Sequence, residues 1–286
     1  MDNVIKVNNL TKTYDNFKLD NITLEIKKGS IIGLIGENGA GKTTLIKLLL
    51  GLIKKDRGDI LIFNKNVNNK VKEDIGVVLD DSFFPEVIKV KDINSIMKNI
   101  YKTWDEKLFF KYLKDFSLNE NMLIKNLSKG MKKKLEIITA LSHHPKLLIL
   151  DEPTSGLDPI VRKEILDIFL DFIENGENSI LFSSHITSDI ESIADYIIFI
   201  DNGKLVFDKE KDDILDNYGI VKCNASDFKK ISKEVIISYR KNKYNYEALV
   251  TDRKKVKKNN PNLVVDRATL EDIMLLIVKG EKEWKV

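Results

Sequence analysis

The stretch of sequence that decides the fold is Ile31–Thr43, which reads IIGLIGENGAGKT. Its first five residues are an unbroken apolar run, typical of a strand that is buried on both faces of a sheet. The run leads into a glycine-rich turn, and Thr44–Leu50 then has the pattern of a helix. This order predicts an α/β fold in which a tight loop joins a buried strand to a helix.

The loop fits the pattern G-x-x-x-x-G-K-[ST] at Gly36–Thr43. Glycines let successive backbone N–H groups point inward around an anion, and the positive end of the following helix points at the same place. Lys42 would contact the β- and γ-phosphates, and the Thr43 hydroxyl would bind Mg²⁺. The predicted nucleotide-binding residues of this loop are Gly36, Asn38, Gly39, Ala40, Gly41, Lys42, Thr43 and Thr44.

A second group of polar residues follows another buried strand, Leu147–Leu150. Asp151 and Glu152 come directly after it, at the carboxyl end of a strand, where open α/β sheets bind ligands. Adjacent residues of a strand point in opposite directions, so the two carboxylates have different roles. Asp151 is predicted to hold Mg²⁺ through water, and Glu152 to orient or deprotonate the water that attacks the γ-phosphate.

The wider pattern predicts a mostly parallel sheet with three additions. Val4–Val7 and Asn21–Ile26 alternate as half-buried antiparallel strands do, which predicts an N-terminal antiparallel β subdomain. The predicted ATPase core is 1–86 with 144–218, and an all-helical subdomain is inserted at 87–143. Residues 219–286 form a small α+β appendage, which ends in a helix at Thr269–Val278.

Composition excludes several classes of protein. The single cysteine excludes a disulfide framework, and the absence of a long apolar run excludes a membrane-spanning helix. The sequence therefore predicts a soluble intracellular protein. The net charge is +3, but residues 220–286 hold 16 Lys and Arg against 9 Asp and Glu. The basic run Arg253–Lys258 is interpreted as a solvated loop rather than a nucleic-acid site, because no aromatic residues interleave with it; weak attraction to anionic lipids stays open.

On these motifs the chain resembles the ATP-binding subunit of an ATP-binding cassette (ABC) transporter, over roughly residues 1–218. Tyr14 falls where the family places a ring that stacks on adenine, and Leu127–Met131 lies at the position of the signature sequence. Ser155–Asp158 matches the loop that crosses the dimer interface, and His185 the histidine that senses the γ-phosphate. The resemblance implies that Glu152 and His185 are catalytic, with ATP and Mg²⁺ as ligands.

The resemblance also implies partners. In the family, two subunits pair head to tail, so that Ser128 and Gly130 of one cap the nucleotide on Lys42 of the other, and Asp158 belongs to the same interface. The second subunit is a copy of this chain or a paralogous ATPase, and both bind an integral membrane permease. The implied location is cytoplasmic, peripheral on the inner face of the cell membrane, and no nucleic acid is expected.

Two positions depart from the family pattern. Asp80 stands where a glutamine usually follows the strand Ile75–Leu79, and it is predicted to bind Mg²⁺, as a carboxylate can. The signature has Lys129 and Met131 in place of glycine and glutamine. This combination resembles bacterial exporters of the ABC-2-like type, whose permease is a separate polypeptide.

Other interpretations remain open at this point. One is a soluble ABC ATPase that acts on a protein complex, for example an assembly ATPase; another is a regulatory module that binds ATP without hydrolysing it, which Glu152 and His185 argue against. Phe83-Phe84-Pro85 either docks the permease or packs inside the helical subdomain. His143, His144 and Cys223 are assigned no functional role.

Overall fold

The computed structural model describes residues 3–80 and 83–281, and the chain separates between Asp208 and Lys209 into two compact units. This division lies before the predicted start of the C-terminal segment at residue 219. No helix in the described ranges combines the length and the apolar character that crossing a lipid bilayer requires.

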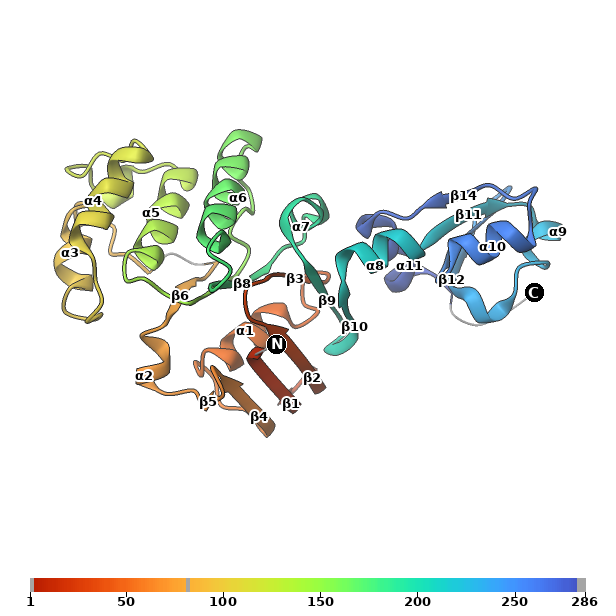
Figure 1. Cartoon of the computed structure of the whole chain (residues 1–286), viewed down its shortest axis with the longest axis horizontal. Coiled ribbons are helices and arrows are strands. Elements are labelled where there is room, and N and C mark those ends of the chain that lie inside the picture. The colour runs from red at the N-terminus through yellow and green to blue at the C-terminus, as the bar shows by residue number, and fades with distance from the viewer. Residues whose placement is uncertain (1–2, 81–82, 282–286) are drawn as a thin grey trace. The chain divides into compact units, whose positions relative to one another are not determined.

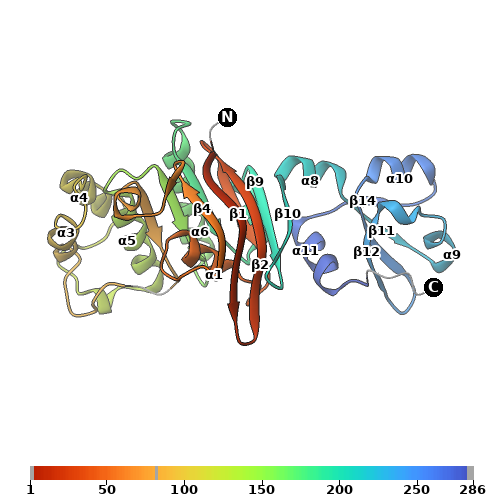
Figure 2. The ribbon, with the colours of Figure 1, turned by 90° about the horizontal axis from the view of Figure 1, so that it is seen from below.

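The first unit begins with an antiparallel sheet in the strand order β2-β1-β4-β5. Its strands are β1 (Asn3–Tyr14), β2 (Phe17–Lys27), β4 (Arg57–Ile62) and β5 (Lys65–Asn66). Figure 2 shows β1 and β2 side by side as a long hairpin. Both strands are longer than predicted, because register shifts let the pairing pass through polar residues that break the alternation. Asn9, for example, lies at such a shift and has a positive φ of 49°.

The central sheet of this unit has the strand order β10-β9-β3-β8-β7-β6. Its strands are β3 (Ile31–Ile35), β6 (Ile75–Val78), β7 (Leu147–Leu150), β8 (Ser179–Ser183), β9 (Tyr196–Asp201) and β10 (Lys204–Glu210). The pairs β3–β8, β3–β9, β7–β8 and β6–β7 are parallel. The predicted α/β class, with a mostly parallel sheet and an antiparallel subdomain, is therefore confirmed. The carboxyl ends of these parallel strands lie at one edge of the sheet.

Helices cover both faces of the central sheet (Figure 1). Helix α1 (Lys42–Leu49) lies between this sheet and the antiparallel sheet, while α6 (Pro159–Ile173) and α7 (Thr187–Ile193) lie on the opposite face. The apolar face of α1, which includes Leu45, Ile46 and Leu49, belongs to one buried cluster with residues of both sheets. Helix α1 is therefore held rigidly beneath the loop that precedes it. The short helix α2 (Asn69–Lys72) leads into β6.

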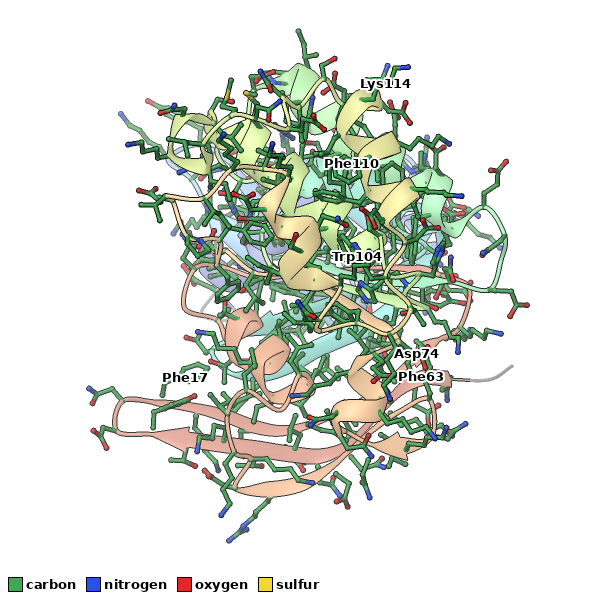
Figure 3. All side chains as sticks on the ribbon, turned by 90° about the vertical axis from the view of Figure 1, so that its left-hand side faces the viewer. Phe17, Phe63, Asp74, Trp104, Phe110 and Lys114 are labelled. Carbon is green, nitrogen blue, oxygen red and sulfur yellow. The ribbon has the colours of Figure 1, made fainter. Side chains whose placement is uncertain are left out.

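The helical insertion contains α3 (Asp92–Met97), α4 (Glu106–Asp115), the 3₁₀ turn η1 (Ile124–Asn126) and α5 (Lys129–Leu141). Phe109 and Leu113 are buried at the centre of its own apolar cluster. Trp104 and Phe110 lie among these helices, whereas Phe17 lies at the end of the β1–β2 hairpin (Figure 3). The insertion thus has a core of its own.

The second unit is a small α+β fold whose sheet has the order β12-β13-β11-β14. The paired strands of this sheet are antiparallel. Phe228, Tyr239 and Tyr246 form its aromatic core, with the rings of Phe228 and Tyr246 stacked at 4.5 Å between centroids. Its elements are α8 (Lys211–Asn217), β11 (Gly219–Cys223), α9 (Ala225–Phe228), η2 (Lys233–Val235), β12 (Ile236–Lys241), β13 (Tyr246–Val250), α10 (Arg253–Asn259), β14 (Val265–Arg267) and α11 (Leu270–Lys279).

The basic run Arg253–Lys258 forms helix α10, so its interpretation as a loop was wrong. Asp252 caps the helix, because its side chain accepts a hydrogen bond of 2.9 Å from the backbone N–H of Lys255. Val256 is buried and anchors the helix to the core of this unit. One buried valine among charged residues was too weak a periodic signal to predict a helix.

Candidate functional site

The glycine-rich loop joins β3 to α1 and is shaped by close contacts. Gly36 has a φ of 158°, and a Cβ at this position would collide with the carbonyl oxygen of Ile200 on β9. Gly41 has a φ of 115°, and a Cβ there would lie 2.9 Å from the ring of Phe17. Only glycine fits at these two positions without strain. The loop is therefore held by the sheet on one side and by the hairpin on the other.

Beside this loop lies a cleft of about 560 Å³. It combines residues of the loop with Asp80, after β6, and Glu152, after β7. It thus brings together three segments that are far apart in sequence, as the parallel topology predicts. The lining residues are Asn16, Phe17, Glu37, Asn38, Gly39, Gly41, Lys42, Thr43, Thr44, Asp80 and Glu152. Gly36 and Ala40 belong to the loop but are buried behind this surface.

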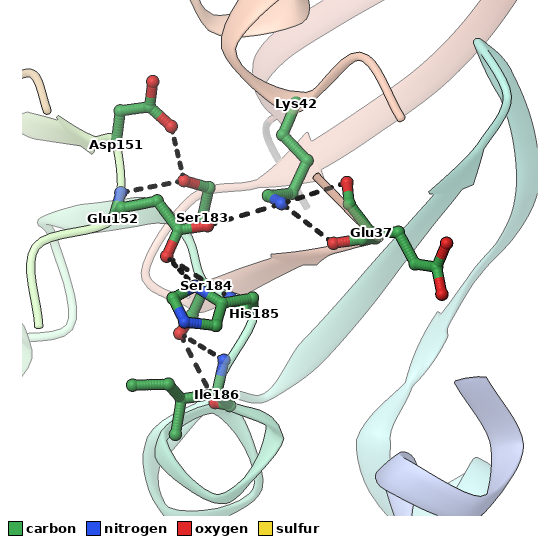
Figure 4. Close-up of polar contacts among 9 residues, drawn as sticks. Glu37, Lys42, Asp151, Glu152, Ser183, Ser184, His185 and Ile186 are labelled. Atoms are coloured by element: carbon green, nitrogen blue, oxygen red, sulfur yellow. Dashed lines mark hydrogen bonds and ion pairs between the residues drawn. The ribbon is translucent and has the colours of Figure 1, made fainter. Parts of the chain in front are cut away.

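Lys42 lies at the floor of the cleft with its side chain almost fully buried. Its Nζ donates to the carbonyl oxygen of Gly36 at 2.8 Å and contacts that of Glu37 at 3.4 Å. The same ammonium is 3.3 Å from Oε1 of Glu152, and the two side chains are only 6% and 13% exposed. Figure 4 shows Lys42 reaching toward Glu152 from the opposite side of the cleft. A cation in so little water is a strong binding point for phosphate.

Ser183 joins the two carboxylate residues that follow β7. Its Oγ donates to Oδ1 of Asp151 at 2.6 Å and accepts from the backbone N–H of Glu152 at 2.9 Å. Ser183 and Asp151 are both buried. Sequence analysis missed Ser183, although a signal existed: β7 and β8 are both buried runs that end in polar residues, and neighbouring parallel strands place such ends together.

Glu152 has a backbone conformation that is rare for residues other than glycine. Its φ is 49°, which costs about 1–2 kcal/mol for a residue with a side chain. The bond from its N–H to Ser183 holds this conformation. As a result its carboxylate turns toward His185, whose Nδ1 is 2.6 Å from Oε2 (Figure 4). Glu152, His185 and Lys42 therefore form one chain of polar contacts, with Glu152 at its centre.

The oxygen atoms at the cleft fit a magnesium ion. The Thr43 hydroxyl and the Asp80 carboxylate line the same cleft, and Asp151 follows the neighbouring strand β7. Mg²⁺ takes one or two carboxylates and completes its shell with water and phosphate oxygens. Within residues 3–80 and 83–281, no cluster of three or more acidic, histidine or cysteine side chains is arranged as a metal site. Because Mg²⁺ needs six oxygen ligands and these residues supply only some of them, the donor set suits an ion that arrives with a phosphate ligand.

The aromatic ring that lines the cleft is Phe17. Tyr14, the predicted adenine-stacking residue, is 44% exposed and does not belong to the lining. The two residues face each other across the β1–β2 hairpin, and their ring centroids are 6.4 Å apart. A hairpin places both rings near the loop, so the sequence motif alone did not distinguish them.

Ser128, Gly130 and Asp158 do not line the cleft. Ser128 caps α5, with its Oγ accepting from the N–H of Met131 at 3.2 Å. Asp158 caps α6, with its Oδ1 accepting from the N–H of Ile160 at 3.0 Å. A Cβ on Gly130 would lie 3.2 Å from Val161 of α6, so the starts of α5 and α6 are neighbours. These three predicted residues form a second surface within the same unit.

A small groove of about 110 Å³ lies between β6 and the helical insertion. Phe83 is 71% exposed at this groove, whereas Phe84 packs against the apolar cluster of the insertion. Packing inside the helical subdomain is therefore confirmed for Phe84, whereas Phe83 stays exposed and its docking role stays a prediction. Buried Glu136 also lines the groove.

Comparison with known proteins places these features in a family. Residues 19–155 match the family model described as ABC transporter. The chain is 40% identical over 215 residues to the bacitracin transport ATP-binding protein BcrA of Bacillus licheniformis, covering 72% of this chain and 69% of that protein. It is 36% identical over 212 residues to the lantibiotic transport ATP-binding protein SrtF of Streptococcus pyogenes, covering 73% and 92%.

Solved structures give the same result for the fold. A structure described as the ATP-binding subunit of an ABC transporter has a TM-score of 0.67 and 27% identity, and the match covers 74% of this chain and 91% of that one. CbiO1 from Clostridium perfringens, described as part of the transporter complex cbiONQ, has a TM-score of 0.64 and 26% identity, with 75% and 91% covered.

Proposed function

The chain belongs to the ABC transporter family as an ATP-binding subunit, and on this premise we propose that it hydrolyses Mg-ATP between two head-to-tail subunits to power an exporter. The observation that carries this proposal is the contact chain Lys42–Glu152–His185 at the phosphate loop. It supplies a cation for the phosphates, a carboxylate for the attacking water and a hydrogen-bonding group beside both.

Each residue then has a defined task. Lys42 binds the β- and γ-phosphates as a buried point charge. Glu152 accepts a proton from water while the water oxygen bonds to the γ-phosphorus, and the bond from phosphorus to the bridging oxygen of ADP breaks. His185 orients the Glu152 carboxylate through Nδ1 and contacts the γ-phosphate. Phe17, rather than Tyr14, stacks on the base, because its ring lines the cleft.

Magnesium would be held by Thr43, Asp151 and Asp80 together with phosphate oxygens. The bound ion would neutralise charge on the β- and γ-phosphates. Asp151 takes its orientation from Ser183, which occupies Oδ1 and leaves Oδ2 for a water in the metal shell. Asp80 follows β6, the strand beside β7, and lines the same cleft.

The head-to-tail dimer is supported by the second surface, formed by Ser128, Gly130 and Asp158. These residues lie outside the lining of the cleft in their own chain, so they contact a nucleotide only if it is bound by another subunit. A copy of this chain or a paralogous ATPase would supply that cleft. ATP then joins two subunits, and its hydrolysis separates them.

The permease is proposed to dock at the groove that Phe83 lines. Met97 and Tyr101 also line it, and the residue before each of them, Ile96 and Ile100, is 39% and 58% exposed. Exposed apolar side chains at a groove favour a protein partner. Docked in this way, the subunit would lie on the inner face of the membrane. Transport, rather than the alternative of a soluble assembly ATPase, is favoured because the relatives are named as transport proteins.

The decisive experiment replaces Glu152 with glutamine and measures molar mass by size-exclusion chromatography with light scattering. Glu152→Gln should bind ATP, lose hydrolysis by about 10²–10⁴-fold and elute as a stable dimer with ATP and Mg²⁺. Asp167→Asn, an exposed carboxylate of α6, is the matched control and should behave as the natural chain. A Glu152→Gln subunit that binds ATP and stays monomeric would contradict the head-to-tail arrangement.

A further inference from the structure

Helix α5 carries a buried lysine that no role in the cleft explains. Lys133 is 5% exposed, and its Nζ donates to the carbonyl oxygen of Leu79 at 3.1 Å. Its counter-ion is Glu136, one turn further along the helix, at 2.9 Å. Burying both charges requires substantial desolvation, so such a pair is weak evidence for added stability. A gain in stability therefore does not explain why this ion pair is buried.

The hydrogen bond joins two parts of the proposed site. Leu79 directly precedes Asp80, which lines the cleft. Lys133 lies in the second turn of α5, the helix that Ser128 caps and whose first turn contains Gly130. A displacement of the Asp80 turn would move the Leu79 carbonyl oxygen, and the charge-assisted bond to Lys133 could carry this movement to α5.

We infer that Lys133 is a positioning residue that couples the Asp80 turn to the Ser128–Gly130 end of α5, with Glu136 as its buried counter-ion. This inference rests on the proposed function. It deepens that function by naming how one subunit's own nucleotide sets the orientation of the surface that caps its partner's nucleotide.

Glu136 extends the same link to the groove. It lines the groove together with Phe83 and Tyr101, and its Oε2 is the oxygen paired with Lys133. A protein partner seated in the groove therefore lies against the counter-ion of the bond that holds the Asp80 turn. The Lys133–Glu136 ion pair therefore borders the groove through Glu136 and is joined to the Asp80 turn through Leu79.

The test compares Lys133→Met with Lys132→Met. Lys132 is the neighbouring lysine, and its partner is Glu86, at 3.0 Å. Lys133→Met should bind a fluorescent ATP analogue within about twofold of the natural affinity, while ATPase turnover and the ATP-driven dimer each weaken by about tenfold. Lys132→Met should change neither property. Lys133→Arg, which retains the donor, should restore part of the turnover.

Two further variants separate coupling from stability. The double variant Lys133→Met/Glu136→Leu replaces the ion pair by apolar side chains, which is often neutral or stabilising. Its melting temperature should recover while its turnover stays low. At saturating Mg²⁺, where the loss of a metal ligand is compensated, combining Lys133→Met with Asp80→Ala should be no worse than the more damaging single variant, because Asp80 and Lys133 act through the same turn.

Two results would overturn the inference: additive losses for Asp80→Ala and Lys133→Met, or turnover that recovers with stability in the apolar double variant. Either would leave the ATPase proposal intact. A natural chain that neither hydrolyses ATP nor dimerises with it would instead overturn both.

Discussion

Lys42 Nζ lies 3.3 Å from Glu152 Oε1, so the cation of the phosphate loop faces the carboxylate that follows β7. Oε1 of Glu152 is buried and accepts no hydrogen bond from the residues described, which leaves Lys42 as its source of positive charge. In the proposed reaction, a γ-phosphate entering the cleft would compete with Glu152 for this ammonium. With Lys42 bound to the phosphate, the Glu152 carboxylate would then be free to act on water.

Replacing Lys42 with alanine should lower ATP affinity by roughly 10- to 100-fold, the loss expected for charge-assisted hydrogen bonds. Equilibrium titration with a fluorescent ATP analogue measures this loss. Lys47→Ala removes an exposed lysine from the last turn of the same helix and is the control. Unchanged affinity in Lys42→Ala would remove this lysine from the phosphate site.

Ser183→Ala should lower turnover by about tenfold or more while leaving ATP affinity nearly unchanged, because Ser183 orients Asp151 and Glu152 without lining the cleft. Steady-state kinetics with a separate binding titration would show this division. Ser179, at the other end of β8, is equally buried and accepts from the N–H of Gly29 at 3.0 Å. If Ser179→Ala lowered turnover as much as Ser183→Ala, the effect of Ser183→Ala would reflect lost stability and not the orientation of Asp151 and Glu152.

Phe17→Ala should weaken ATP binding by about tenfold, in the range of a lost aromatic–base stack. Tyr14→Ala should have a smaller effect, since that ring lies outside the lining of the cleft. Titrations with ATP and with inorganic triphosphate separate base contacts from phosphate contacts. The reverse order of effects would support Tyr14 as the stacking residue.

Asp80→Ala should raise the magnesium concentration needed for half-maximal ATPase activity, because a carboxylate is a stronger Mg²⁺ ligand than water. The measurement is the ATPase rate as a function of Mg²⁺ at saturating ATP. The exposed carboxylate of Asp167 again provides the control, through Asp167→Asn. A magnesium profile identical to that of the natural chain would exclude Asp80 from the metal site.

We expect the buried His143 to lower the free energy of unfolding in mild acid. Burial lowers its pKa from 6.5 to about 4, and its ring stacks on Tyr101 at 3.9 Å between centroids. Above pH 6.5 the ring is neutral in both the folded and the unfolded chain. As the pH falls toward 4, only the unfolded chain takes up the proton, so the free energy of unfolding decreases by about 1.4 kcal/mol per pH unit.

Urea unfolding between pH 7 and pH 4.5 measures this dependence. His143→Phe keeps an aromatic ring on Tyr101 and removes the titrating group, so its free energy of unfolding should vary less with pH. His144→Gln is the control, because His144 is an exposed neighbour. Parallel curves for the natural chain and His143→Phe would show that His143 does not cause the acid sensitivity.

The sequence by itself determined the features that depend on neighbours in the chain. The glycine spacing of Gly36–Thr43 and the apolar runs of β3 and β7 are local patterns, so the α/β class and the phosphate loop followed from them. Local patterns failed where pairing or packing overrode alternation. The hairpin continues through polar Asn8 and Asn9. In the helical insertion, Ile93, Ile96 and Ile100 recur at helical spacing, yet of these three only Ile93 is buried.

Contacts between distant segments were decided by the tertiary structure alone. Ser183 contacts Asp151 and Glu152 because β8 lies beside β7. The sequence of one strand does not indicate which other strand pairs with it. Phe17 reaches the cleft, and Lys133 reaches Leu79, only after the hairpin and α5 have packed against the loop and β6. Side-chain chemistry can be read along the chain, but the partner of each group depends on packing, which is a property of the whole fold.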